Sequence, residues 1–82
     1  MRALVHVTLK KTVLDPQGRT ICSTLNGLGH GNVVDIRQGK YFEIELADGP
    51  SPDEVRRQVE KIAGDVLANP VIEEFHVDVA DG

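Results

Sequence analysis

Residues 51–80 read SPDEVRRQVEKIAGDVLANPVIEEFHVDVA, and this stretch decides the fold because a helix signal runs directly into a strand signal. Ser51 and Glu54 form an S-x-x-E capping box, with Pro52 at the first helical position. Apolar residues then recur at helical spacing, at Val55, Val59, Ile62, Ala63, Val66 and Leu67. Asn69-Pro70 ends the predicted helix, since the residue before proline is pushed out of the α region.

Alternating residues predict strands at both ends of the chain. Val71 to Ala80 alternates apolar with polar residues, as does Ala3 to Lys10 near the other end. Between them, Asp15-Pro16 predicts the start of a first helix, with Asp15 as N-cap. Its apolar stripe consists of Ile21, Leu25 and Leu28. Three glycines end this helix, namely Gly27, Gly29 and Gly31.

Two further alternating runs flank Gly39. Asn32 to Gln38 and Tyr41 to Ala47 predict a β-hairpin that turns at this glycine. The element order is then βαββαβ, and the economical packing is an α+β, ferredoxin-like two-layer sandwich. In it, an antiparallel sheet of strand order 4-1-3-2 carries both helices on one face. We expect a single domain over residues 1–82.

The charge, the lack of long apolar runs and the single cysteine disfavour several classes of protein. Nine Lys and Arg against thirteen Asp and Glu give a net charge of −4, which disfavours nucleic-acid binding. The sequence has no run of 18 apolar residues, so we expect no membrane span, and its start has no signal-peptide pattern. Cys22 is the single cysteine, which suits a reducing cytoplasm.

The sheet face away from the helices is a candidate interface. It would carry Leu4, His6, Thr8, Val33, Asp35, Arg37, Tyr41, Glu43, Glu45, Ile72, Glu74 and His76. This mixture is neither a clean core nor a fully polar surface. The predicted edge strands, 32–38 and 71–80, could each pair with another copy, so we expect a homo-oligomer.

Several patterns that could carry chemistry have simpler explanations. The glycine-rich run 27–31 closes a helix, whereas a phosphate-binding loop opens one. Cys22 has no base beside it in sequence, so a structural thiol is expected. His6 and His76 would be cross-strand neighbours near Glu74, but their spacing is not typical of a metal site. Glu43 and Glu45 are ordinary surface carboxylates of a strand.

Other residues favour a contact surface. Gly18 lies in the first turn of a helix, where glycine costs about 1 kcal/mol relative to alanine, and therefore indicates a close backbone approach. Arg37 and Lys40 would place two cations at the tip of the predicted hairpin. Asn69-Pro70 and Glu73 form a rigid corner before the last strand.

Three blocks containing these residues resemble the PurS family, the small subunit of phosphoribosylformylglycinamidine synthase. The blocks are Val13-Leu14-Asp15-Pro16-Gln17-Gly18, Asp35-Ile36-Arg37-Gln38-Gly39-Lys40 and Leu67-Ala68-Asn69-Pro70-Val71-Ile72-Glu73. They occur in register over essentially the whole chain. Phe75 stands where a tyrosine is more usual, and the Gly64-Asp65-Val66 ending of the second helix is less apolar than is common.

The resemblance implies a role in de novo purine biosynthesis. The synthase converts formylglycinamide ribonucleotide (FGAR) to formylglycinamidine ribonucleotide (FGAM) with glutamine and ATP. It implies that a large subunit binds ATP and magnesium and that a glutaminase subunit releases ammonia. The small subunit, which has no catalytic residue, cofactor or metal, would form a dimer or a dimer of dimers. It would join the other two subunits and support ammonia transfer.

Partner-binding residues are carried over from the family motifs by position. They are Asp15, Gln17, Gly18, Arg37, Lys40, Asn69 and Glu73, with Pro16, Gly39 and Pro70 in the same motifs. Two rival classes stay open: a ferredoxin-like regulatory module that binds a small molecule between subunits, and a small transfer enzyme. The first predicts a thermal shift with a small molecule alone, and the second predicts turnover by the isolated chain.

Overall fold

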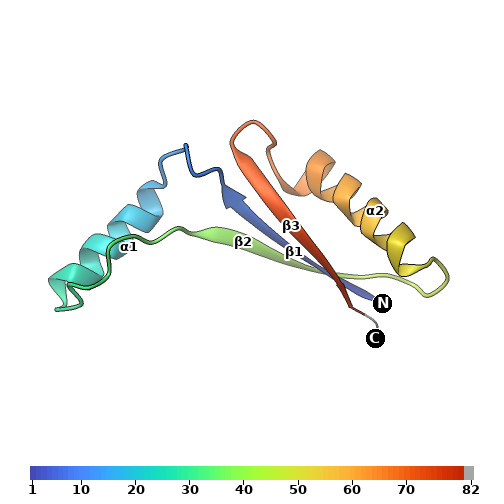
Figure 1. Cartoon of the computed structure of the whole chain (residues 1–82), viewed down its shortest axis with the longest axis horizontal. Helices are drawn as coiled ribbons and strands as arrows, with labels where there is room; N and C mark the ends of the chain where they lie inside the picture. The colour runs from blue at the N-terminus through green and yellow to red at the C-terminus, as the bar shows by residue number, and fades with distance from the viewer. Residues whose placement is uncertain (81–82) are drawn as a thin grey trace.

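The computed structural model describes residues 1–80, which contain three strands and two α-helices (Figure 1). The elements are β1 (Arg2–Leu9), α1 (Pro16–Gly27), β2 (Gly39–Glu45), α2 (Pro52–Ile62) and β3 (Glu73–Ala80). A short π-helix, η1 (Ala63–Leu67), follows α2 directly. Among the described residues, no helix combines the length and the apolar character needed to cross a membrane.

The sheet is antiparallel and has β1 at its centre, in the order β2-β1-β3. Val5 of β1 lies between Phe42 and Val77, whereas the next residue, His6, lies between Tyr41 and His76. Successive side chains point to opposite faces, so one face is apolar and the other is largely polar. The predicted α+β class is confirmed, and these three strands stand in the predicted order.

Helix α2 covers the apolar face over β1 and β3 (Figure 1). The buried core consists of Ala3, Val5, Val7, Val55, Val59, Ala63, Ala68 and Val77. The predicted capping box starts α2, where the Glu54 N–H donates to Ser51 Oγ at 3.3 Å. Helical structure continues through η1, whose last turn closes where the Ala68 N–H donates to the Ala63 carbonyl at 2.8 Å.

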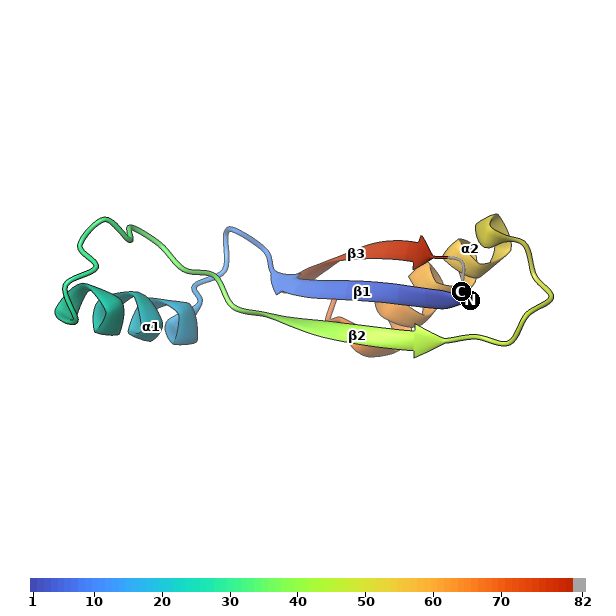
Figure 2. The same ribbon diagram turned by 90° about the horizontal axis from the view of Figure 1, so that it is seen from below.

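Helix α1 and the segment that returns from it form an arm, residues 16–38, that points away from the sheet (Figures 1 and 2). Gly29 turns the chain at the far end of the arm with φ of +103°, a conformation that favours glycine. The extents of the chain are 51 × 28 × 14 Å and its radius of gyration is 16.3 Å. A compact domain of this length has a radius of gyration of about 12 Å.

The structure corrects the predicted hairpin. Residues 33–38 form no strand, and the chain passes straight from them into β2 (Figure 2). Gly39 is the first residue of β2 and pairs with Thr8. A Cβ at Gly39 would lie 2.6 Å from the Val7 carbonyl oxygen. Glycine is therefore needed at this position for the close contact between β1 and β2, and not for a turn. Helix α1 lies in the arm, whereas the sequence predicted that it would pack on the sheet of its own chain.

Candidate partner-binding surface

Residues from three distant parts of the sequence meet where the arm joins the sheet. A pocket of about 190 Å³ at this point is lined by Val7, Leu9, Asp15, Gln17, Gln38, Gly39, Lys40 and Glu73. We use "the junction" for the polar and glycine residues in and beside this pocket: Asp15, Gln17, Gly18, Gln38, Gly39, Lys40, Asn69 and Glu73. The fold thus brings together most of the residues that the motifs singled out.

Asp15 connects both ends of the arm. Its side chain is buried, with one oxygen, Oδ1, accepting from the Gly18 N–H at 3.0 Å and the other, Oδ2, from the Gln38 N–H at 2.7 Å. The hydrogen bond from Gln38, followed by that from Gly18, lowers the pKa of Asp15 below its ordinary value of 3.8, although burial opposes the shift. The predicted N-cap is confirmed, and it also holds the last residue of the arm.

Gly18 is buried because the returning segment crosses it. A Cβ at this position would overlap the Ile36 carbonyl oxygen, and it would lie 2.8 Å from Asp15 Oδ2 and 3.0 Å from the Ile36 carbonyl carbon. The close backbone approach expected from a glycine in the first turn of α1 therefore occurs within the chain itself.

Lys40 and Glu73 join β2 to the start of β3. The Lys40 Nζ lies 3.4 Å from Glu73 Oε2, while Glu73 Oε1 accepts from the Asn69 N–H at 2.8 Å. The hydrogen bond from Asn69 is the main cause that lowers the pKa of Glu73 below its ordinary value of 4.5, with Lys40 contributing and burial opposing. Asn69 Oδ1 also accepts from the Val71 N–H at 3.1 Å, which shapes the predicted corner at Pro70.

Arg37 lies beside the junction and binds the loop between β1 and α1. Its Nη2 donates to the carbonyl oxygens of Lys10 at 3.0 Å and Val13 at 2.9 Å. The prediction that Arg37 and Lys40 are two cations at a hairpin tip is therefore wrong. Each side chain instead binds a group of its own chain, Arg37 two carbonyl oxygens and Lys40 the Glu73 carboxylate. Direct partner contacts of the seven motif residues stay a prediction.

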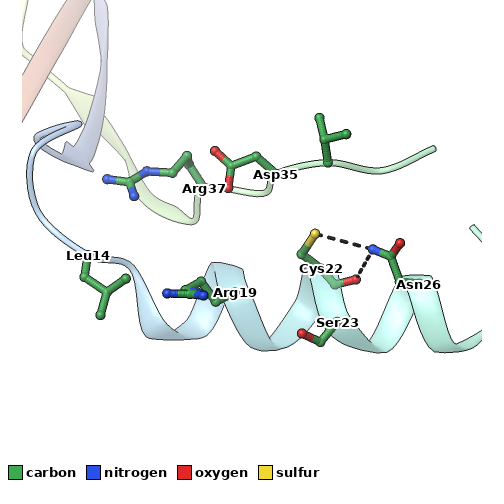
Figure 3. A pocket seen from close by; sticks show the side chains of 8 residues that line it. Leu14, Arg19, Cys22, Ser23, Asn26, Asp35 and Arg37 are labelled. Atoms are coloured by element: carbon green, nitrogen blue, oxygen red, sulfur yellow. Dashed lines mark hydrogen bonds between the residues drawn. The ribbon is translucent and has the colours of Figure 1, made fainter. Parts of the chain in front are cut away.

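A wider groove of about 630 Å³ lies between α1 and residues 34–37 (Figure 3). Its lining includes Leu14, Arg19, Cys22, Ser23, Asn26, Val34, Asp35 and Arg37. The half-buried Cys22 thiol donates to the Val33 carbonyl at 3.6 Å, and Asn26 Nδ2 donates to the same oxygen at 3.0 Å. These contacts fit the expected structural role of Cys22, because they hold the returning segment beside α1.

The polar face of the sheet carries a row of rings. His6 stacks on Tyr41 with ring centroids 4.9 Å apart, and it pairs with His76 across the strands, as the sequence predicted. Tyr41 Oη donates to Glu43 Oε1 at 3.2 Å, and burial together with this bond raises the pKa of Tyr41. Within residues 1–80, no three His, Cys, Asp or Glu side chains are grouped to hold a metal ion.

Sequence reasoning missed the backbone groups that the side chains of the arm and the junction contact. The Gln38 N–H and the carbonyls of Ile36 and Val33 take part through the backbone, and every non-proline residue has the same backbone groups. The glycine at position 18 was the available signal that some backbone passes close to α1.

The polar residues of the junction bind backbone N–H groups and one another, which is a structural arrangement and not that of a nucleophile beside its base. A small α+β chain with such a junction, and with an arm that the sheet of its own chain leaves uncovered, has the features expected of an assembly subunit. The particular family follows from comparison: the family model described as "PurS: Phosphoribosylformylglycinamidine (FGAM) synthase" matches residues 2–81, and the chain belongs to this family.

Relatives from bacteria and archaea agree with this assignment. The chain is 45% identical to the phosphoribosylformylglycinamidine synthase subunit PurS of Mycobacterium leprae, over 93% of this chain and 91% of that protein. It resembles the crystal structure of Methanocaldococcus jannaschii PurS with a TM-score of 0.89 and 37% identity, over 99% and 96% of the two chains. A chain in the structure of PurLQS from Thermotoga maritima matches with a TM-score of 0.84 and 28% identity, over 94% and 93%.

Proposed function

We propose that this chain acts as the non-catalytic small subunit of an FGAM synthase complex, joining the large ATP-dependent synthetase to the glutaminase subunit. The observation that carries the proposal is the match to the PurS family over residues 2–81. A structural neighbour that belongs to a PurLQS assembly supports the idea of a multi-subunit complex. Homo-oligomers, as dimers or dimers of dimers, form part of the same proposal.

The chemistry then takes place on the other subunits. The large subunit binds ATP, magnesium and FGAR, and the glutaminase supplies ammonia, while this chain holds no cofactor. Keeping the two active sites together raises the effective concentration of ammonia at the synthetase, a proximity effect that needs no reactive group from the linking chain. We place the complex in the cytoplasm, where the single thiol of Cys22 stays reduced.

Reconstitution tests the role directly. The synthetase and the glutaminase are assayed for FGAM formation with glutamine, with and without this chain, and ammonium chloride replaces glutamine in the control. We expect glutamine-dependent turnover to require the chain and ammonia-dependent turnover to proceed on the large subunit alone. Unchanged glutamine-dependent turnover in the absence of the chain would contradict the proposal.

Substitution of Gln17 tests whether the junction contacts the other subunits. Gln17 is exposed beside the pocket, so its truncation should leave the fold intact. Gln17→Ala is compared with Gln58→Ala, which removes the same exposed side chain from α2. We expect only Gln17→Ala to weaken co-purification with the other subunits, and equal yields from both variants would remove Gln17 from the contact.

A further inference from the structure

The groove between α1 and residues 34–37 has the size of a small-molecule site and shares no lining residue with the junction pocket (Figure 3). Its volume is about 630 Å³, and clefts that hold small molecules measure roughly 300–1,000 Å³. Two arginines, an aspartate, a serine and an asparagine line it together with the apolar Leu14 and Val34. A few polar groups in such a cleft fix the orientation of a ligand.

The groove lies in a basic part of an acidic chain. Residues 10–38 contain four Lys and Arg against two Asp, a net charge of +2 with His neutral. The rest of the sequence contains five Lys and Arg against eleven Asp and Glu, a net charge of −6. Two of the four cations, Arg19 and Arg37, line the groove. The local charge therefore attracts an anion to the groove, although the chain as a whole is acidic.

Arg37 is held in place but keeps most of its donors. Its Nη2 donates to two backbone carbonyl oxygens of the loop between β1 and α1, at 3.0 and 2.9 Å, and these acceptors are neutral. After the hydrogen bonds from Gln38 and Gly18, the Arg37 charge contributes to the lowered pKa of Asp15. Both Asp15 oxygens, however, accept from those backbone N–H groups. Within residues 1–80, Nε and Nη1 of Arg37 donate to no other group, so they are available to a ligand.

Arg19 and Asp35 lie across the groove from each other, Arg19 on α1 and Asp35 on the returning segment beside Arg37 (Figure 3). Among the described residues, neither side chain forms an ion pair. Guanidinium groups donate planar pairs of hydrogen bonds to a phosphate, which is why arginine is favoured at phosphate sites. The Asp35 carboxylate only accepts hydrogen bonds, so it suits hydroxyl groups next to that anion.

Self-association through the apolar stripe of α1 leaves this groove open. Ile21 belongs to the stripe and is 40% exposed. An α-helix turns by about 200° over two residues, so Ile21 and Arg19 project from nearly opposite sides of α1. A second copy that covers the stripe therefore does not cover the Arg19 side of the helix.

We propose that the groove binds a phosphorylated sugar, either free or as part of a nucleotide. The phosphate group lies between the guanidinium groups of Arg19 and Arg37, and sugar hydroxyl groups donate to the Asp35 carboxylate. Ser23 follows Arg19 by one turn of α1 and adds a hydroxyl group to the same lining. Ligand binding of this kind is additional to the linking role of the subunit and does not depend on it.

Titration of the full-length chain, with backbone amide shifts followed by NMR, tests the site. The probes are ribose 5-phosphate, AMP, inorganic phosphate and ribose. We expect ribose 5-phosphate to shift the amides of Ser23 and Asn26, phosphate to bind more weakly, and ribose not to bind. Tighter binding of AMP than of ribose 5-phosphate would identify the ligand as a nucleotide, and equal or weaker binding as a free sugar phosphate. No shift at these amides, or equal binding of ribose and ribose 5-phosphate, would overturn the proposal.

Two arginine variants that change the net charge equally test the role of Arg19. Arg19 and Arg57 are exposed residues of α1 and α2, and Arg57 lies outside the groove. We expect Arg19→Gln to raise the dissociation constant of ribose 5-phosphate at least about tenfold, because it removes a charged donor, and Arg57→Gln to leave it unchanged. Equal effects of the two variants would show general attraction to the chain and overturn the proposal.

Asp35→Ala tests the recognition of the sugar. Asp35 is exposed, so the variant should keep the fold. We expect it to retain binding of inorganic phosphate and to lose the preference for ribose 5-phosphate over phosphate, because the acceptor for the hydroxyl groups is gone. An unchanged preference would contradict the assignment of the sugar to Asp35. These titrations omit the other subunits, so they can fail while the reconstitution succeeds, and the reverse.

Discussion

Replacing Gly18 by alanine should separate the structural role of the junction from simple helix propensity. In an exposed helix, alanine is more favourable than glycine by about 1 kcal/mol, so propensity alone predicts that Gly18→Ala stabilises the protein. At Gly18 the added Cβ meets the Ile36 carbonyl group and Asp15 Oδ2, the latter at 2.8 Å. We therefore expect the opposite sign.

The size of the effect follows from the displacement that the methyl group requires. Ordinary contact begins at about 3.4 Å, so the neighbours must move by at least about 0.6 Å, and more at the Ile36 oxygen. Such a movement stretches the 2.7 Å hydrogen bond from the Gln38 N–H to Asp15. Overpacking against a rigid backbone costs about 3 kcal/mol, which leaves a net loss of about 2 kcal/mol after the gain in propensity.

Gly27→Ala supplies the matched control in the same helix, because a methyl group added there would meet no neighbouring atom within 4 Å. We expect this variant to gain about 0.5–1 kcal/mol. Urea denaturation followed by circular dichroism, at one fixed chain concentration, should separate the two midpoints by about 2–3 M for a slope of about 1 kcal/mol/M. A Gly18→Ala protein as stable as Gly27→Ala would refute the assignment of Gly18 to a backbone contact.

The remaining predictions concern acidity and packing. The pKa values of Asp15 and Glu73 lie below their ordinary values of 3.8 and 4.5, so their contribution to stability is complete above about pH 4.5 and is lost as pH falls through the lower folded-state values. Urea midpoints between pH 7 and pH 3 should fall accordingly, and Asp15→Asn should flatten the fall. Gly39→Ala should displace β2 from β1, since the added Cβ would lie 2.6 Å from the Val7 carbonyl oxygen. We expect faster hydrogen exchange of the β2 amides than in the unsubstituted chain, and slower exchange would contradict this. Val59→Ala should cost about 2 kcal/mol by emptying part of the core, and a loss below 0.5 kcal/mol, a threshold of order RT, would argue against full burial of Val59.

Helix α2 illustrates what local sequence can predict. The capping box at Ser51 predicted its start, which is confirmed. Val55 and Val59 of the predicted apolar stripe are buried, whereas Val66, predicted on the same stripe, lies in η1 and is 76% exposed. The junction was predictable only in part. Its residues stood out as motif positions, and Gly18 indicated a close approach, but the partners of Asp15 and Gly18 are backbone groups at Gln38 and Ile36.

Gly39 shows the difference between what the local sequence determines and what only the tertiary structure decides. By itself, the sequence determined the α+β class, the apolar face of each strand and the family to which the chain is similar, because side-chain pattern and capping are local properties. The path of the chain at Gly39 was decided only by tertiary structure. Glycine permits either a turn or a close strand contact, and the choice depends on the Val7 carbonyl and on the bond between Asp15 and Gln38, which join residues far apart in the chain.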